Sequence, residues 1–184
     1  GGSTWHWLGN TPRFLPRDFR LHGEYGVGVD WPFGYEELEP WYGEAERELG
    51  VSGDDLEWKD VHGAFRTTPF PMLPSWRAYG DEVVAESLDG ESFDGVSIRL
   101  RVTPQARNSV PYQGRPPCAG NSSCVPICPV AAKYDATVHV RLAREAGATF
   151  DHRCVVRRLV PDGEGRIQTV VFDRWSPDGA TVFY

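Results

Sequence analysis

Three of the four cysteines in this 184-residue chain lie within eleven residues, at positions Cys118, Cys124 and Cys128. Thiolate sulfur is the usual protein ligand of iron–sulfur clusters. The pattern C-x5-C-x3-C, with Pro129 directly after the last cysteine, suits a three-iron, four-sulfur (3Fe-4S) cluster, in which each iron takes one external ligand. The small, turn-prone residues 120–123 allow the backbone to wrap around such a group and to point amides at sulfur.

Two other arrangements of these thiols stay open from spacing alone. One is a disulfide between two loop cysteines, with the third left free. The other is a zinc site completed by His139 or His152, although the spacing departs from the common zinc patterns. The fourth cysteine, Cys154, lies in a strand-like pattern and is expected to be a small buried hydrophobic residue rather than a ligand.

Composition narrows the class of protein. The chain is 40% hydrophobic and 24% charged, which is typical of a globular chain about one domain long. Its formal net charge of −7 disfavours nucleic acid as a partner, because phosphate binding normally needs a basic face. No apolar run approaches the ~20 residues that span a bilayer.

Helices that would position the cysteine loop are predicted from apolar periodicity and end signals. Residues 1–30, rich in glycine, proline and aromatic residues, are expected to be extended loop. Helices are expected at residues 35–50, 76–88 and 135–146. Gly50 and Gly147 suit the ends of the first and third helices.

Strands are predicted on both sides of the cysteine loop. Residues 96–102 alternate between apolar and polar side chains, which predicts a half-buried strand. Residues 149–160, 166–175 and 179–184 are further strand candidates, separated by the turn sequences PDGEG and SPDG. A helix followed by such a β-meander predicts an α+β chain.

Two stretches together resemble one family. Residues 1–19, GGSTWHWLGNTPRFLPRDF, and residues 115–136, RPPCAGNSSCVPICPVAAKYDA, are similar to the large subunits of gluconate 2-dehydrogenase, fructose dehydrogenase and bacterial FAD-dependent glucose dehydrogenase. These subunits form a branch of the glucose–methanol–choline (GMC) oxidoreductases. Residues 30–51 and 106–118 carry the same likeness, so the resemblance runs essentially from end to end.

The resemblance implies an incomplete, loop-rich fragment of a Rossmann-like FAD-binding domain with part of the substrate domain, ending in the β-meander. It divides the chain into a flavin-contacting loop with its following helix (1–57), a substrate-side region (58–113), a cluster loop (114–132), and a helix plus meander that returns to the FAD domain (133–184). The family's GxGxxG pattern and catalytic histidine have no match here, so no catalytic residue is assigned. Alone, the chain is expected to be poorly folded and inactive.

The resemblance also implies cofactor contacts. The family's Gly-Gly-Ser stretch lies against the flavin, which assigns Gly1, Gly2, Ser3, Thr4 and Trp5 to the cofactor. Glycine suits this role because backbone without a Cβ can approach a cofactor closely.

Two further residues are assigned by the same resemblance. His6 stands in a context similar to that of a pyranose oxidase histidine bonded to the flavin 8-position, so FAD is either covalent through His6 or merely contacted by it. Val155 aligns with a valine at the adenine. The remaining histidines are expected to be surface or structural: His22, His62, His139 and His152.

The resemblance, together with the cysteine spacing, implies an FAD-dependent dehydrogenase acting on the CH–OH group of a sugar, polyol or aldonic acid. Electrons would pass from flavin through the 3Fe-4S cluster to a cytochrome c subunit. A small subunit is a second expected partner, and the location is the bacterial periplasm, with membrane contact only through a partner. The alternatives are a cluster-free GMC oxidase or dehydrogenase with a loop disulfide, and a non-enzymatic metal or electron-transfer module.

Overall fold

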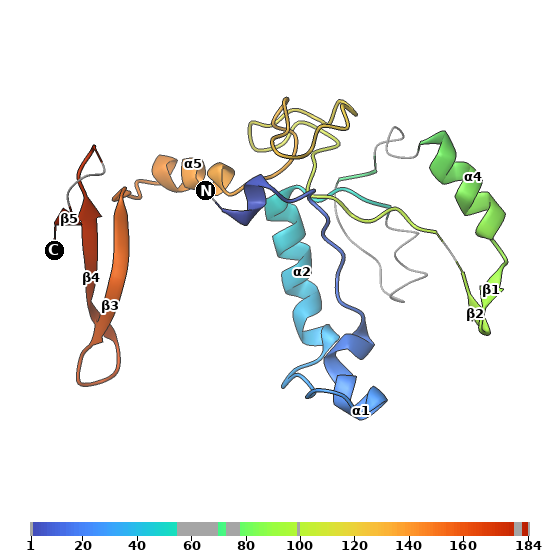
Figure 1. Ribbon diagram of the computed structural model, residues 1–184, viewed down its shortest axis with the longest axis horizontal. Helices are drawn as coiled ribbons and strands as arrows, with labels where there is room; N and C mark the ends of the chain where they lie inside the picture. Colours follow the sequence, from blue (N-terminus) through green and yellow to red (C-terminus); the bar gives the residue numbers. More distant parts are fainter. Residues whose placement is uncertain (1, 55–69, 73–77, 99, 179–181, 184) are drawn as a thin grey trace. The chain divides into compact units, whose positions relative to one another are not determined.

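The computed structural model describes residues 2–54, 70–72, 78–98, 100–178 and 182–183 (Figure 1). The chain divides into two compact units, Gly1–Val138 and His139–Tyr184, with the boundary inside helix α5. Helices and strands are both present, so the α+β prediction is confirmed. The described elements are η1 (Ser3–Trp5), η2 (Pro16–Arg20), α1 (Leu21–Tyr25), α2 (Tyr35–Leu49), α4 (Tyr79–Leu88), β1 (Ser92–Phe93), β2 (Val96–Ser97), α5 (Thr137–Glu145), β3 (Cys154–Pro161), β4 (Ile167–Trp175) and β5 (Val182–Phe183).

The extended loop expected for residues 1–30 is wrong over its second half, where η2 and α1 form a short helical run. The Leu15 backbone N–H donates to the Asp18 carboxylate at 2.6 Å, which caps η2. Pro16 occupies the first helical position, where its missing N–H costs nothing. Gly26, with a φ of 68°, ends α1. These local signals outweigh the glycine and aromatic content of the segment.

Helix α2 confirms the helix predicted at residues 35–50. It ends at Gly50, whose φ is 69°. A Cβ on Gly50 would lie 2.6 Å from the Oδ1 atom of Asn108 and 2.8 Å from the Nη2 atom of Arg115. Glycine is therefore required at this position both by backbone conformation and by space.

Phe19 lies at the centre of an aromatic cluster that joins η2 to the start of α2. Its side chain is 1% exposed. The ring of Phe19 is 5.7 Å from that of Trp31 and 6.5 Å from that of Tyr35, with edge-to-face geometry in both pairs. Phe14 and Phe33 complete the cluster at 6.2 Å and 6.1 Å from Phe19. The cluster is the main apolar support of the N-terminal segment.

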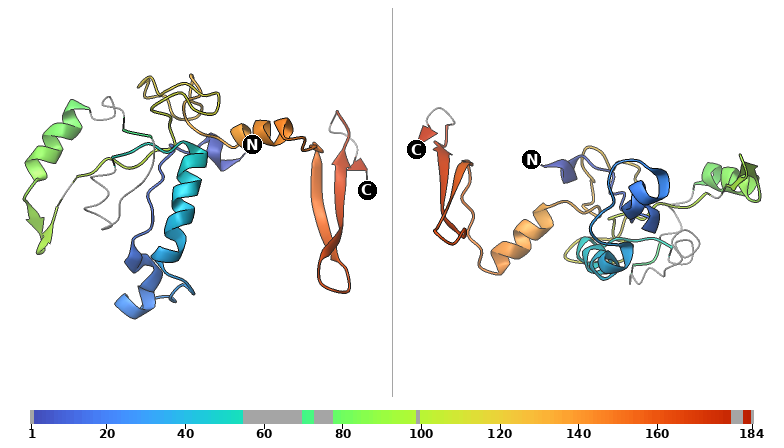
Figure 2. Two further views of the ribbon diagram at one scale, coloured as in Figure 1. Left: turned by 180° about the vertical axis from the view of Figure 1, so that it is seen from behind. Right: turned by 90° about the horizontal axis from the view of Figure 1, so that it is seen from below.

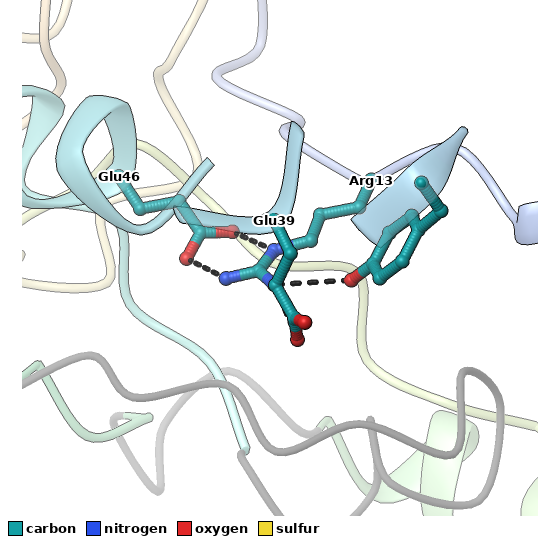
Figure 3. Close-up of polar contacts among 4 residues, drawn as sticks. Arg13, Glu39 and Glu46 are labelled. Carbon is teal, nitrogen blue, oxygen red and sulfur yellow. Dashed lines mark hydrogen bonds and ion pairs between the residues drawn. The ribbon is translucent and has the colours of Figure 1, made fainter. Parts of the chain in front are cut away.

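A buried ion pair holds the same segment against α2 (Figure 3). The Nε and Nη2 atoms of Arg13 donate to the two carboxylate oxygens of Glu46 at 2.9 Å and 2.8 Å. Nη1 of Arg13 donates to the Tyr35 hydroxyl at 3.1 Å. Burial alone would lower the pKa of Arg13, but the hydrogen bonds to Glu46 and Tyr35 raise it above its ordinary value, so the guanidinium stays charged.

Residues 104–109 form a central strut of unit Gly1–Val138. The Ala106 N–H donates to the Gly9 carbonyl at 2.7 Å, and Ser52 and Gln105 exchange two backbone hydrogen bonds of 2.8 Å and 2.9 Å. On the other side, Asn108 and Ala106 pair with residues 132–134. The strut therefore joins the N-terminal loop, the chain that follows α2 and the chain that leaves the cysteine loop.

The half-buried strand predicted at residues 96–102 is wrong for its described residues. Only β2 forms, paired with β1 in a short hairpin around Gly95. The predicted apolar face is not covered, since Val96 is 68% exposed and Leu100 is 41% exposed. Alternation shows which side chains share a face, but a strand also needs a neighbour to pair with.

Helix α4 confirms the helix predicted at 76–88 over Tyr79–Leu88; residues 76–77 lie outside the described part.

The helix predicted at residues 135–146 is confirmed as α5. The Asp135 carboxylate accepts the Thr137 N–H at 2.9 Å at its start, and Gly147 ends it with a φ of 90°. The meander is confirmed too: β3, β4 and β5 pair antiparallel in that order, and Figure 2 shows β3 and β4 as a long hairpin. The first strand begins at Cys154 rather than at residue 149. Backbone N–H groups of Glu164 and Arg166 donate to Asp162 in the connecting turn, which lowers the pKa of that carboxyl.

We expect Arg13→Met to destabilise the full-length protein by about 3–5 kcal/mol, because Glu46 would remain buried without its charge partner. Arg47→Met is the matched control: it removes an exposed pair with Glu44 and should cost less than about 1 kcal/mol. Urea unfolding of both variants measures the difference. Equal midpoints would show that the buried pair does not support the fold.

Candidate functional site

The Lys133 side chain joins the predicted flavin-lining segment to the cysteine loop. Its side chain is buried, with 3% of the residue exposed. The Nζ atom donates to the carbonyl of Cys124 at 2.6 Å, to that of Trp7 at 2.7 Å and to that of Trp5 at 3.4 Å. An ammonium has three N–H donors, so all three find acceptors. The two segments that the sequence assigns to two cofactors are therefore in contact through one cation.

A small pocket of about 90 Å³ lies at this junction. Its lining includes Trp5, from the predicted flavin segment, and Cys128, from the predicted cluster ligands. The rest of the lining is Ile127, Ala131, Lys133 and Asp135. One residue of the predicted flavin site, Trp5, and one predicted cluster ligand, Cys128, therefore line the same pocket.

Each sulfur of the three loop cysteines accepts hydrogen bonds from N–H groups. The Gly120 N–H donates to Cys118 Sγ at 3.5 Å, and Nη1 of Arg107 donates to Cys124 Sγ at 3.4 Å. Burial would raise the pKa of the Cys128 thiol, but backbone N–H groups of residues 130–133 directed at its sulfur outweigh burial and lower the pKa below its ordinary value. At Cys128 the backbone of the loop therefore stabilises negative charge on sulfur.

Cys154 behaves differently from the loop cysteines. Its Sγ donates a hydrogen bond to the His152 carbonyl at 3.4 Å. It is half-buried, so the expectation of a buried hydrophobic residue is wrong; the start of β3 leaves one side of this residue open. Cys154 is therefore a natural control for the loop cysteines.

The structure bears on the three arrangements considered for the loop cysteines: an iron–sulfur cluster, a disulfide and a zinc site. All four cysteines are free, so the disulfide alternative is not formed in this structure. Across the described part of the chain, no three His, Cys, Asp or Glu side chains are placed to hold one metal ion. The three loop thiols are thus not gathered around a single point. What fits an iron–sulfur cluster is their donor chemistry: three free thiols, each with N–H donors at sulfur.

Most residues assigned to the flavin lie at the surface of unit Gly1–Val138. Gly2, Ser3, Trp5 and His6 are exposed, and Gly1 lies outside the described residues. Thr4 is half-buried, and its hydroxyl accepts the Ala136 N–H at 3.1 Å. The backbone and side chains of these exposed residues are accessible to a cofactor. In the other unit, the Val155 side chain on β3 is 48% exposed.

The histidines outside this segment have ordinary surroundings where they are described. His22 is exposed, and His152 is exposed with its Nε2 atom 3.2 Å from Nη2 of Arg144. His139 is half-buried on α5, and His62 lies outside the described residues.

Two residues of the site were missed by sequence reasoning, Lys133 and Arg107. The partners of Lys133 are backbone carbonyls, which carry no residue-type signal. The one available hint was a lysine standing alone in the apolar run VAAKY, directly after the cysteines.

A larger open pocket of about 530 Å³ lies elsewhere, between η2 and the start of α2. Its lining includes side chains of both charges, Arg17, Arg20, Glu24 and Glu36, and none of the predicted site residues. Size alone does not make it the functional site.

We expect the Cys128 thiol of the folded protein to ionise at lower pH than in the denatured chain, because backbone N–H groups stabilise its thiolate. The test uses a variant in which the other three cysteines are serine, and measures the alkylation rate of Cys128 against pH, folded and in denaturant. A depressed pKa stabilises the fold fully above the pKa of the denatured chain, and this stabilisation is lost as pH falls through the folded pKa. If the alkylation rate rises around the same pH in the folded and the denatured protein, the result contradicts the structure.

No described helix is both long enough and apolar enough to cross a membrane. Comparison with protein-family models gives no match.

Comparison with characterised proteins gives clear relatives. The chain is 42% identical over 178 residues to the large subunit of fructose dehydrogenase from Gluconobacter japonicus, covering 97% of this chain and 31% of that protein. It is 34% identical over 177 residues to 6'''-hydroxyparomomycin C oxidase from Streptomyces lividus, covering 92% and 31%. It is 26% identical over 134 residues to the gluconate 2-dehydrogenase flavoprotein of Pantoea cypripedii, covering 61% and 21%.

The chain thus spans 31% of the length of the first two of these relatives. The likeness to the fructose dehydrogenase large subunit extends over nearly all of its own residues, including the whole cysteine loop and the helix that follows. The chain therefore belongs to the GMC oxidoreductases and is related to their FAD-dependent sugar and aldonic acid dehydrogenases.

Proposed function

We propose that the protein containing this chain is an FAD-dependent dehydrogenase that oxidises the CH–OH group of a sugar, polyol or aldonic acid and exports electrons through a 3Fe-4S cluster. The observation that carries the proposal is the junction at Lys133, where Trp5 and Cys128 line one pocket. The names of the relatives, a fructose dehydrogenase and a gluconate 2-dehydrogenase, support the substrate class.

The flavin-side residues have the properties this role needs. Gly2 has a φ of 131°, which an L side chain rarely adopts, and a Cβ there would meet nothing within 4 Å. This backbone is open to a large planar ligand. When bound, FAD supplies hydride acceptance and the cluster supplies one-electron transfer. Gly2, Ser3, Thr4, Trp5 and His6 would line the flavin, with Val155 at the adenine.

The cluster-side residues hold charge rather than perform chemistry. Cys118, Cys124 and Cys128 would be the iron ligands. Each sulfur has an N–H donor, and at Cys128 the backbone donors stabilise the thiolate form that binds iron. At Cys124 the Nη1 atom of Arg107 supplies a hydrogen bond to the ligand sulfur at 3.4 Å.

Export of single electrons requires an acceptor outside this chain. A cytochrome c subunit would receive them, with a small subunit as the second partner. The proposed location is the bacterial periplasm, with membrane contact made only by a partner subunit.

A cluster-free oxidase is the second candidate. Two relatives favour an oxidase, since both 6'''-hydroxyparomomycin C oxidase and the paromamine 6'-oxidase of Streptomyces fradiae are named as oxidases. The free state of all three loop cysteines favours the dehydrogenase.

We expect the purified full-length protein to contain about three irons per flavin and to give the electron paramagnetic resonance of an oxidised three-iron centre. Cys124→Ser should abolish both, because serine offers a poorer ligand at the same position. Cys154→Ser is the matched control and should leave iron and signal unchanged. Wild-type protein with flavin but no iron would overturn the dehydrogenase proposal in favour of the oxidase.

A second experiment decides how His6 meets the flavin. If His6 is the covalent attachment site, yellow colour should stay with the denatured protein, and His6→Ala should release it. Release of flavin from denatured wild-type protein would exclude covalent attachment and leave His6 as a contact residue. Binding of FAD by His6→Ala, measured by flavin content before denaturation, controls for loss of the fold.

A further inference from the structure

Lys133 is a buried cation with an unusual set of partners. Its three hydrogen bonds go to carbonyl oxygens of Trp5, Trp7 and Cys124. In the described part of the chain no carboxylate forms an ion pair with it, in contrast to Arg13, which is paired with Glu46. Carbonyl dipoles satisfy the N–H groups but leave a net positive charge inside the protein. A buried charge without a counter-charge is costly, so an anionic neighbour is expected.

The anionic neighbour is indicated by the groups around the same pocket. Cys128 and Lys133 both line it, and the backbone N–H of Lys133 is itself one of the donors directed at the Cys128 sulfur. Asp135 is the other ionisable group in the lining. Of the three proposed iron ligands, Cys128 is the one in this lining.

We propose that Lys133 is a positioning residue with two roles: it ties the Trp5–Trp7 segment to the cysteine loop, and it is the counter-charge of the Cys128 thiolate in the pocket that both residues line. The tie follows from carbonyl acceptors in two segments that lie 117 and more residues apart in sequence (Trp7 to Cys124: 124 − 7 = 117). The inference rests on the proposed function, since the counter-charge matters only when the thiolates hold an electron carrier.

The two roles predict distinct effects on electron flow. Removing the charge makes reduction of the carrier less favourable, because an added electron is no longer attracted by the ammonium. Coulomb attraction between charges that line one pocket in a protein interior makes this a change of about tenfold or more in the equilibrium constant. For a one-electron couple, tenfold corresponds to about 59 mV. Loss of the tie should slow transfer from flavin to cluster while leaving reduction of the flavin by substrate unaffected.

The experiment uses the full-length protein with Lys133→Met and Lys133→Arg. Redox titration followed by electron paramagnetic resonance should show the midpoint potential of the cluster lowered by about 59 mV or more in the methionine variant. The arginine variant keeps the positive charge, so its cluster should have a midpoint potential close to that of the wild type. Stopped-flow absorbance should show flavin reduction by substrate within about twofold of wild type, and onward transfer slowed by about tenfold.

Arg166→Met is the charge-matched control, because it removes one cation from an exposed turn and should change neither potential nor rate. An unchanged potential and an unchanged onward rate in Lys133→Met, with the wild-type cluster present, would overturn the inference. A wild type without iron would instead overturn the proposed function on which it rests.

If Lys133→Met contains no iron, its midpoint potential cannot be measured. Iron content in two further variants then tests whether Lys133 acts as a counter-charge. Iron retained by Lys133→Arg and lost by a neutral Lys133→Gln supports a counter-charge. Iron lost equally in both, with thermal unfolding at the wild-type temperature, overturns it.

Discussion

The geometry of the site depends on one buried stretch of backbone, the strut at residues 104–109. Buried N–H and C=O groups need partners, and in a loop-rich fold few of them come from helices or sheets. This strut shares its groups among the N-terminal loop, residue Ser52 after α2, and residues 132–134 after the cysteine loop. It therefore fixes the distance between segments that would otherwise be free to separate. Side-chain bonds of Asn108 to the carbonyls of Tyr112 and Arg115 hold the next turn in the same way.

Basic side chains donate hydrogen bonds to several other backbone carbonyls in unit Gly1–Val138. Lys133 serves three carbonyls, and Arg115 donates to those of Leu49 at 3.0 Å and Ala132 at 3.4 Å. Arg13 is the exception, since its partners are a carboxylate and a hydroxyl. Loops expose carbonyls that secondary structure would pair, and long basic side chains can reach several at once.

The cysteine loop shows how a chain without regular structure can still prepare a charged site. Ser122 and Ala131 both have positive φ, near 55°, a conformation that turns successive N–H groups toward one side. The result is most developed at Cys128, whose sulfur receives backbone donors from residues 130–133. Cys154, in a regular strand, donates its own proton instead. Backbone conformation, rather than residue type, separates the two kinds of cysteine.

Sequence alone determined the elements whose signals are local. The helices at α2 and α5 follow from apolar spacing with Gly50, Asp135 and Gly147 at their ends, and the meander follows from its turn residues. Spacing also singled out the three loop cysteines. Tertiary structure alone decided which alternating segment becomes a strand, since the described residues of 96–102 pair only with the two-residue strand β1. It also decided the role of Lys133, because hydrogen bonds to distant carbonyls depend on how the chain folds back and leave no trace in residue type.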